Sequence, residues 1–109
     1  MTENISFSDF QKMDIRIGKI ESAERVEGTD RLLNLKVSFG TEKRQIVAGL
    51  AQMYSPEQLV GRKTIFLFNL EAKRMRGLES RGMILVAGSE GRYTLLVPDR
   101  DVPEGARLE

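Results

Sequence analysis

The chain has 109 residues, which is enough for one small domain but too few for two independent cores. Hydrophobic residues make up 40% and charged residues 30%, a balance typical of a globular protein, and the net charge is +1. Cysteine and histidine are both absent, which excludes disulfides, thiolate or imidazole metal ligands, and every catalytic triad that uses histidine. We therefore expect neither a metal nor a cofactor.

No segment approaches the roughly 20 consecutive apolar residues that a membrane-spanning helix needs. The N-terminal residues are polar and acidic and lack the apolar core of a secretory signal. These features predict a cytoplasmic protein that does not contact a membrane. We expect one domain over residues 1–109, with an N-terminal arm at 1–10 and a C-terminal extension at 89–109.

The first half of the chain predicts three strands. A long first strand starts at Asp14, and Gly18 lies where the apolar parity changes between Ile17 and Ile20, which predicts a bulge or bend. Residues 33–39 alternate between apolar and polar side chains, the pattern of a half-buried strand. Residues 40–43 predict a hairpin turn, and residues 44–50 predict the third strand.

The second half adds a short helix and further strands. Ser55 and Pro56 are typical of a helix N-cap and first helical position, and Gly61 requires the helix to be short. Residues 63–70 are strongly apolar and predict a strand buried on both faces. Residues 83–87 and 92–97 predict strands, the last of which ends at Pro98.

This order of elements favours an all-β fold. It fits a five-stranded oligonucleotide/oligosaccharide-binding (OB) barrel with a short helix between strands 3 and 4 and a C-terminal β extension. Closing the sheet into a barrel removes the free edges that a small domain tolerates poorly. An open β-sandwich is the competing architecture.

The segment from Asn69 to Met83 carries the strongest signal of function. Four cations lie within nine residues, at Lys73, Arg74, Arg76 and Arg81, and they are accompanied by the polar side chains of Asn69 and Ser80. This composition suits contacts with phosphates and with folded RNA. The alternatives are a solvated loop, a core position for Met83, and an Asn69 that satisfies backbone groups at a strand end.

Other chemistry finds little support in the sequence. The carboxylates form no recognisable catalytic pair, no phosphate-binding or nucleophile motif is present, and Asp30 fits an Asx turn. Most aromatic residues fall at core-like positions, so extensive stacking on unpaired bases is not expected. Recognition of folded RNA by shape and phosphates fits better.

Taken together, these segments resemble the tRNA-binding domain appended to methionyl-tRNA synthetases. The same module occurs as a separate synthetase β-subunit, as a free-standing structure-specific tRNA-binding protein, and in the endothelial-monocyte-activating-polypeptide group. The motifs that carry the resemblance span nearly the whole chain: residues 7–10, 14–20, 26–33, 44–50 and 54–57, then Asn69-Leu70, Lys73–Gly77, Ser80–Met83 and Val102–Gly105.

The resemblance implies an OB barrel, usually a homodimer, that binds tRNA by its folded shape. It places RNA contacts at Asn69, Lys73, Arg76, Ser80 and Met83, with Arg31 in the turn before the second strand. Arg74 and Arg81 add positive charge beside them. Arg81 stands where the family commonly has glutamate, which strengthens phosphate attraction, and Ala48 stands where serine is common.

Three hypotheses follow for function. The first is a non-catalytic tRNA-binding module that raises the tRNA affinity of a methionyl-tRNA synthetase catalytic chain. The second is a docking or dimerisation module for a synthetase, using the apolar residues 95–97, with RNA binding incidental. The third is an enzyme of unknown type, which the absence of histidine, cysteine and paired acids disfavours. The initial methionine suggests a separate subunit or free-standing protein, with an excised C-terminal domain as the alternative.

Overall fold

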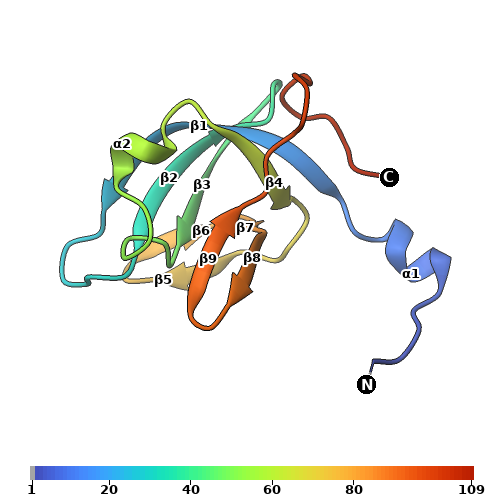
Figure 1. The fold of residues 1–109 in the computed structure, drawn as a ribbon, viewed down its shortest axis with the longest axis horizontal. Coiled ribbons are helices and arrows are strands. Elements are labelled where there is room, and N and C mark those ends of the chain that lie inside the picture. The colour runs from blue at the N-terminus through green and yellow to red at the C-terminus, as the bar shows by residue number, and fades with distance from the viewer. Residues whose placement is uncertain (1) are drawn as a thin grey trace.

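The structure is a computed structural model that describes residues 2–109. Figure 1 shows that most of its regular elements are strands, and the described residues contain two short helices. The elements in chain order are α1 (Phe7–Gln11), β1 (Ile15–Arg25), β2 (Leu33–Ser38), β3 (Lys43–Ala48), α2 (Pro56–Leu59), β4 (Lys63–Leu67), β5 (Lys73–Met75), β6 (Leu78–Ser80), β7 (Met83–Ile84), β8 (Val86–Ser89) and β9 (Arg92–Leu95).

Five of the strands form a nearly closed antiparallel barrel. Their order in the sheet is β3-β2-β1-β4-β7, and β5-β6 and β8-β9 form two separate hairpins. The free edge of β3 meets the chain just before β7, where the Arg81 N–H donates to the Gln45 carbonyl at 2.9 Å. The predicted five-stranded barrel with a helix between strands 3 and 4 is thereby confirmed, and the open β-sandwich is excluded.

The core lies inside the barrel and follows from the alternation in β2. Leu33, Leu35 and Val37 are fully buried, and they pack with Ile46 of β3 and Phe66 of β4. The polar side chains between them face outward, because successive residues of a strand point to opposite faces. The predicted half-buried strand is therefore present.

Gly18 allows three core side chains to approach the first strand closely. A Cβ atom at this position would lie 2.6 Å from Val37 Cγ1, 2.8 Å from Phe39 Cε1 and 2.9 Å from Phe66 Cδ1. The irregularity predicted near Gly18 lies slightly further along β1, where the register with β2 shifts between Ile20 and Ser22. The glycine thus makes room for the core, while the bulge belongs to the next residues.

The fourth strand differs from its prediction. The expected strand over 63–70, buried on both faces, is β4, which ends at Leu67 and buries one face. Thr64 and Phe66 are fully buried, whereas Ile65 and Leu67 are half-buried on the opposite side. Apolar residues occupy both odd and even positions of this segment, so the sequence pattern could not distinguish the buried face of the strand from the half-buried one.

The last residues of the chain return to the start of β1. The Ile17 N–H donates to the Ala106 carbonyl, and the Leu108 N–H donates to the Ile15 carbonyl, each at 2.8 Å. The region predicted as a C-terminal extension, residues 89–109, contains β9 and this segment, whereas β8, which pairs with β9, lies almost entirely before it. The last residues cover an edge of β1 that β2, which pairs only from Lys19 onward, leaves open.

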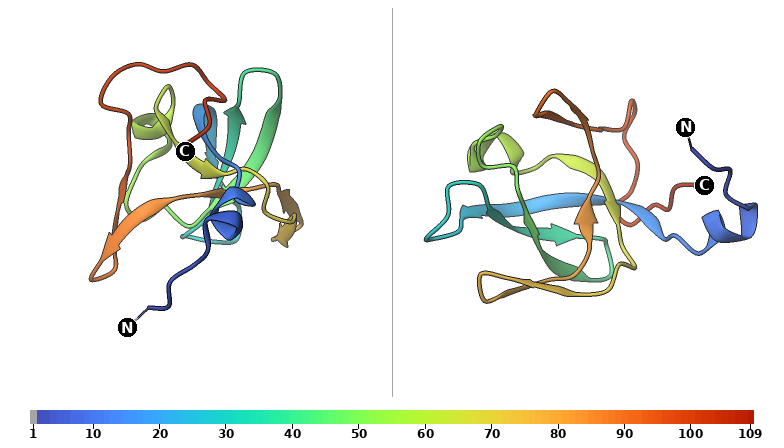
Figure 2. Two further views of the ribbon diagram at one scale, coloured as in Figure 1. Left: turned by 90° about the vertical axis from the view of Figure 1, so that its right-hand side faces the viewer. Right: turned by 90° about the horizontal axis from the view of Figure 1, so that it is seen from below.

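At the other end of the chain, α1 stands apart from the barrel, as Figure 1 and the right-hand view of Figure 2 show. The predicted arm over 1–10 includes residue 1, which lies outside the described residues, and its second half is helical. None of the residues of α1 is buried. Within residues 2–109, no helix is long and apolar enough to cross a membrane.

Candidate nucleic-acid interface

The cationic segment expected as a loop is a β-hairpin. Its register places Lys73 opposite Ser80, Arg74 opposite Glu79, and Met75 opposite Leu78. Arg76 and Gly77 form the two-residue turn, with φ values of 53° and 79°. Positive φ at both positions is the geometry of the type I′ turn that tight hairpins prefer. We call residues 73–81 the basic hairpin.

Strand β6 of the basic hairpin is hydrogen-bonded to β3. Ser80 is only 4% exposed, and its hydroxyl accepts from the Val47 N–H at 3.0 Å and contacts the Gly82 carbonyl at 3.3 Å. The side-chain amide of Gln45 donates to the Glu79 carbonyl at 2.9 Å. These bonds attach the hairpin to the barrel and leave its turn free to project.

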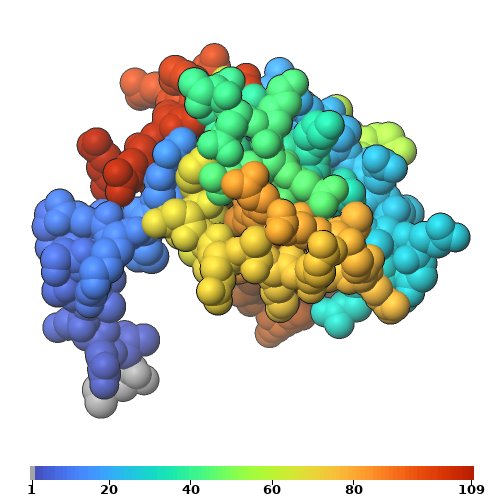
Figure 3. Space-filling view, turned by 180° about the vertical axis from the view of Figure 1, so that it is seen from behind, coloured from blue at the N-terminus to red at the C-terminus, as the bar shows by residue number. Residues whose placement is uncertain are grey.

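The basic side chains of the hairpin point into solvent. Lys73, Arg74, Arg76 and Arg81 are all exposed, and among residues 2–109 none of the four lies within 4 Å of a carboxylate. Arg74 donates to the Gly77 carbonyl across the turn at 2.9 Å. Figure 3 shows this yellow-to-orange segment lying beside the green region of β3 on one face of the molecule. Its positive charge is therefore available to a partner.

Several cations elsewhere are neutralised. Arg16 donates to both carboxylate oxygens of Asp14, at 2.9 and 2.8 Å, and these bonds hold the pKa of Asp14 below its usual value of 3.8. Arg44 pairs with Glu42 at 2.9 Å and lowers the pKa of that carboxyl as well. Both guanidinium groups stack on Phe68, at 3.8 and 3.5 Å from the ring centre.

Asn69 uses its side chain inside the protein. Its Oδ1 accepts from the Asp14 N–H at 2.9 Å, and its Nδ2 donates to the Lys12 carbonyl at 2.7 Å. This is the alternative in which Asn69 satisfies backbone groups at a strand end. Because both ends of the amide are occupied, Asn69 connects the end of β4 to the residues that precede β1.

Two further predicted residues are accessible. Met83 is 44% exposed, so the alternative that placed it in the core is wrong. Arg31 is exposed in the turn between β1 and β2, where its N–H donates to the Thr29 hydroxyl at 3.2 Å. Of the eight predicted site residues, six present their side chains at the surface. The side chains of Asn69 and Ser80 are engaged internally.

Gln45 was not found by sequence reasoning. It lies in a strand of ordinary appearance, and nothing in its neighbours indicates that its amide reaches a segment 34 residues away. No group of three metal-binding side chains occurs among residues 2–109. The basic hairpin is therefore the candidate binding surface that the described residues offer.

A small barrel that presents unpaired cations on a docked hairpin is a binding module suited to a polyanion. Comparison with known proteins gives the family. Residues 15–107 match the family model described as "Putative tRNA binding domain", and the chain belongs to this family. The family is one of binding domains, which agrees with the predicted resemblance and with a non-catalytic role.

Individual relatives agree with this assignment. The chain is 52% identical over 104 residues to a methionine–tRNA ligase of Methanothrix thermoacetophila, covering 95% of this chain but only 15% of the ligase. A MetRS-related protein from Pyrococcus horikoshii has a similar structure, with a TM-score of 0.94 and 38% identity over 99% of this chain and 100% of that one. The chaperone CsaA of Bacillus anthracis is similar too, with a TM-score of 0.89 and 28% identity over 98% and 100% of the two chains.

Proposed function

We propose that this chain binds tRNA by its folded shape, as a non-catalytic module that raises the tRNA affinity of a methionyl-tRNA synthetase. The module acts as a separate β-subunit or as an appended domain of the synthetase. The family and the methionine–tRNA ligase relatives support this proposal, although the chain spans only about a sixth of the ligases that it matches. The strand order and the position of α2 support its assignment as an OB barrel, and the synthetase relatives support a role in protein synthesis in the cytoplasm.

The observation that carries the proposal is the clustering of four unpaired cations on one projecting hairpin. Arg16, Arg44 and Lys63 each have a carboxylate partner, whereas the four cations of the basic hairpin have none within the described part of the chain. Unpaired cations on one projecting element attract phosphates, and binding then releases the counterions that those phosphates had condensed. Arg31 and Met83 extend the same interface, the second with flexible apolar surface.

Recognition by shape follows from the kind of side chains present. The hairpin offers guanidinium and ammonium groups but no aromatic ring, so it has no platform on which unpaired bases could stack. Folded RNA is recognised largely through its phosphates and 2′-hydroxyls. Asn69 and Ser80 belong to the proposed site as positioning residues, because their polar atoms contact the protein backbone. A direct RNA contact from either stays a prediction, which their internal hydrogen bonds disfavour.

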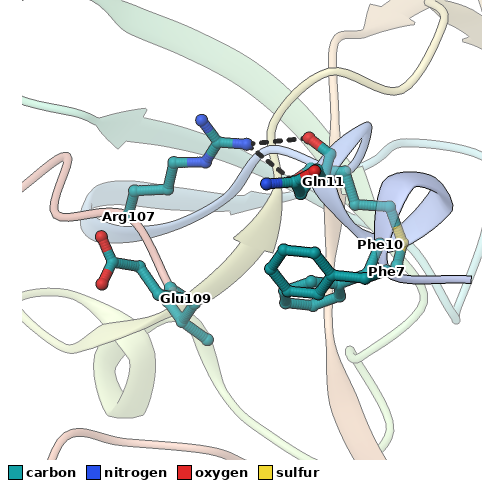
Figure 4. A pocket seen from close by; sticks show the side chains of 7 residues that line it. Phe7, Phe10, Gln11, Arg107 and Glu109 are labelled. Carbon is teal, nitrogen blue, oxygen red and sulfur yellow. Dashed lines mark hydrogen bonds between the residues drawn. The ribbon is translucent and has the colours of Figure 1, made fainter.

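We also infer that the chain acts as a homodimer. Phe7 is 71% exposed and Ile5 is 64% exposed, although both are apolar and belong to or precede α1. Figure 4 shows Phe7 and Phe10 lining an open pocket across from Arg107 and Glu109 of the C-terminal segment. Arg107 donates to the Gln11 carbonyl at 3.1 Å and thereby holds α1 in place. A second copy would cover this surface.

The proposed tRNA binding is tested by a gel-shift series with intact tRNA, unfolded tRNA and duplex RNA. We expect the tightest binding to intact tRNA and a steep loss of affinity with salt. The double variant Lys73→Glu/Arg76→Glu should lose most of this affinity and reduce the slope of log Kd against log salt by about two. A double variant that binds tRNA like the wild type would remove the basic hairpin as the site.

The matched control is Arg62→Glu/Arg100→Glu, which makes the same change in net charge. Both of these arginines are exposed, and Arg62 precedes β4 whereas the basic hairpin follows it. We expect this control to bind tRNA nearly as well as the wild type. An equal loss in both double variants would indicate general attraction to a polyanion instead of a defined site.

A further inference from the structure

The basic hairpin depends on β3 for its orientation. An isolated two-stranded hairpin is at best marginally stable in water, so its direction is set by whatever holds its base. The main-chain bond from the Arg81 N–H to the Gln45 carbonyl, at 2.9 Å, holds one point, and the buried Ser80 hydroxyl holds a second. Both points lie at the end of β6, next to each other in sequence.

Gln45 supplies a third attachment, nearer to the turn. Its Nε2 donates to the Glu79 carbonyl at 2.9 Å, and its Oε1 accepts from the Asn34 side chain at 3.2 Å. The amide is thus fixed at both ends, by β2 on one side and by the hairpin on the other. Glu79 is the partner of Arg74 in the hairpin register, so this bond restrains the middle of the hairpin.

We propose that Gln45 is a positioning residue for RNA binding, which acts by holding the basic hairpin at a fixed angle to the barrel. This inference rests on the proposed tRNA-binding function of the hairpin. Restraining the hairpin before RNA arrives reduces the conformational entropy that binding must remove. It also keeps the cations of the hairpin at fixed distances from Arg31. A folded RNA presents its phosphates at fixed positions, so the cations that bind them must also be fixed. Gln45 itself touches no phosphate in this scheme.

The test replaces Gln45 by leucine, which has a similar size but neither donates nor accepts. In the free protein, we expect faster hydrogen exchange at the amides of β5 and β6 with an unchanged midpoint of urea unfolding. Losing one hydrogen bond should weaken tRNA binding about fivefold. The slope of log Kd against log salt should fall by about one, because fewer phosphates are contacted at the same time.

Ser22→Leu is the matched control. Ser22 is exposed and pairs with Lys36, which in turn pairs with Gln45, so the control puts the same side chain in the same row of the sheet. We expect it to leave hairpin exchange and tRNA affinity unchanged. An equal loss of affinity in both variants would overturn the inference, since this sheet face would then contact RNA directly.

A second variant, Gln45→Glu, keeps the acceptor for Asn34 but cannot donate to the Glu79 carbonyl, and it should speed hairpin exchange as leucine does. Unchanged exchange in both Gln45 variants would overturn the positioning role. If the wild type does not bind tRNA, the proposed function fails, whereas the exchange experiment still decides whether Gln45 restrains the hairpin.

Discussion

Arg76 has a backbone conformation that arginine rarely adopts. Its φ of 53° lies in the left-handed region, which costs an L-residue with a Cβ roughly 1–2 kcal/mol, and which asparagine and glycine tolerate better. Asparagine before Gly77 would therefore be the residue expected in such a turn. Arg76 lies at an exposed turn in a strained conformation and has no carboxylate partner among the described residues. This combination indicates that its guanidinium group serves ligand binding and not stability.

Replacing Arg76 by asparagine should separate stability from binding. We expect the free energy of unfolding to rise by about 0.5–1 kcal/mol, because asparagine relieves the backbone strain. The affinity for tRNA should fall, and the salt slope should decrease by about one, because one phosphate contact is lost. Urea unfolding and gel shifts at several salt concentrations measure the two effects.

The β8-β9 hairpin provides the control for this prediction. Glu90 has a φ of 54° and is followed by Gly91, so its turn has the same backbone geometry as the turn at Arg76. Glu90→Asn should therefore raise stability by a similar amount without weakening tRNA binding. Weaker binding in the Glu90 variant, or unchanged binding in the Arg76 variant, would contradict the role assigned to Arg76.

The sequence located the charged residues, but it could not identify the partners of the polar side chains, although an internal role for Asn69 was one of the alternatives. The four clustered cations were recognisable because their charge alone makes them candidates. The roles of Asn69 and Ser80 depend on which backbone groups lie nearby, at Lys12, Asp14 and Val47, and these are 33 to 57 residues away in the chain. Such contacts exist only once the barrel has closed.

At the scale of elements, Asp14 connects the first strand to the C-terminal segment. Its carboxylate accepts two bonds from Arg16 and lies 3.7 Å from the Arg107 guanidinium, and its side chain is only 19% exposed. The native pKa of Asp14 is lowered, first by the hydrogen bonds from Arg16, so the unfolded chain binds a proton more readily than the folded one. Its contribution is present at neutral pH and is lost as pH falls below 3.8 toward the lowered native value.

Asp14→Asn should therefore destabilise the protein by about 1 kcal/mol at pH 7, through lost charge-assisted hydrogen bonds. The difference from the wild type should shrink at pH 3, where the wild type loses the same interaction. Urea unfolding at the two pH values measures this. Asp9→Asn, which breaks the exposed pair with Lys12, should change stability by less than about 0.5 kcal/mol at either pH. A deficit of equal size at pH 3 would refute the assignment to Asp14.

Elements with a clear local sequence pattern were predicted correctly, and elements without one were not. Residues 33–39 were predicted as a strand because apolar and polar residues alternate when one face is buried and the other is exposed to solvent. The short helix was predicted from its N-cap and Pro56. The basic hairpin was expected as a loop because Arg76-Gly77 is not among the dipeptides that usually signal a tight turn. The first helix was seen only as an amphipathic stretch, since five residues are too few for a clear period.

At the scale of the whole molecule, the chain has two separate surfaces of different chemistry. The basic hairpin lies beside β3, whereas α1 lies beyond the opposite side of the barrel, as Figure 1 shows, and its Phe7 side chain is exposed. Dimerisation through α1 would leave the basic hairpin of each copy free to bind RNA. Two tRNA-binding surfaces on one particle raise the effective concentration of the second site when one RNA can reach both.

The proposed dimer is tested with Phe7→Ser in sedimentation equilibrium. We expect the wild type to be a dimer at micromolar concentration and the variant to be a monomer, because α1 buries none of its own residues and Phe7 contributes the most exposed ring. Val97→Ser is the control, because residues 95–97 were the other apolar segment expected to mediate association; Leu95 is buried in the core, whereas Val97 is 51% exposed. It should remain a dimer. The Phe7 variant should also bind tRNA more weakly, because a monomer has only one tRNA-binding surface. The slope of log Kd against log salt for each protomer should stay the same. A dimer that survives Phe7→Ser but dissociates in Val97→Ser would move the interface to the segment that follows β9.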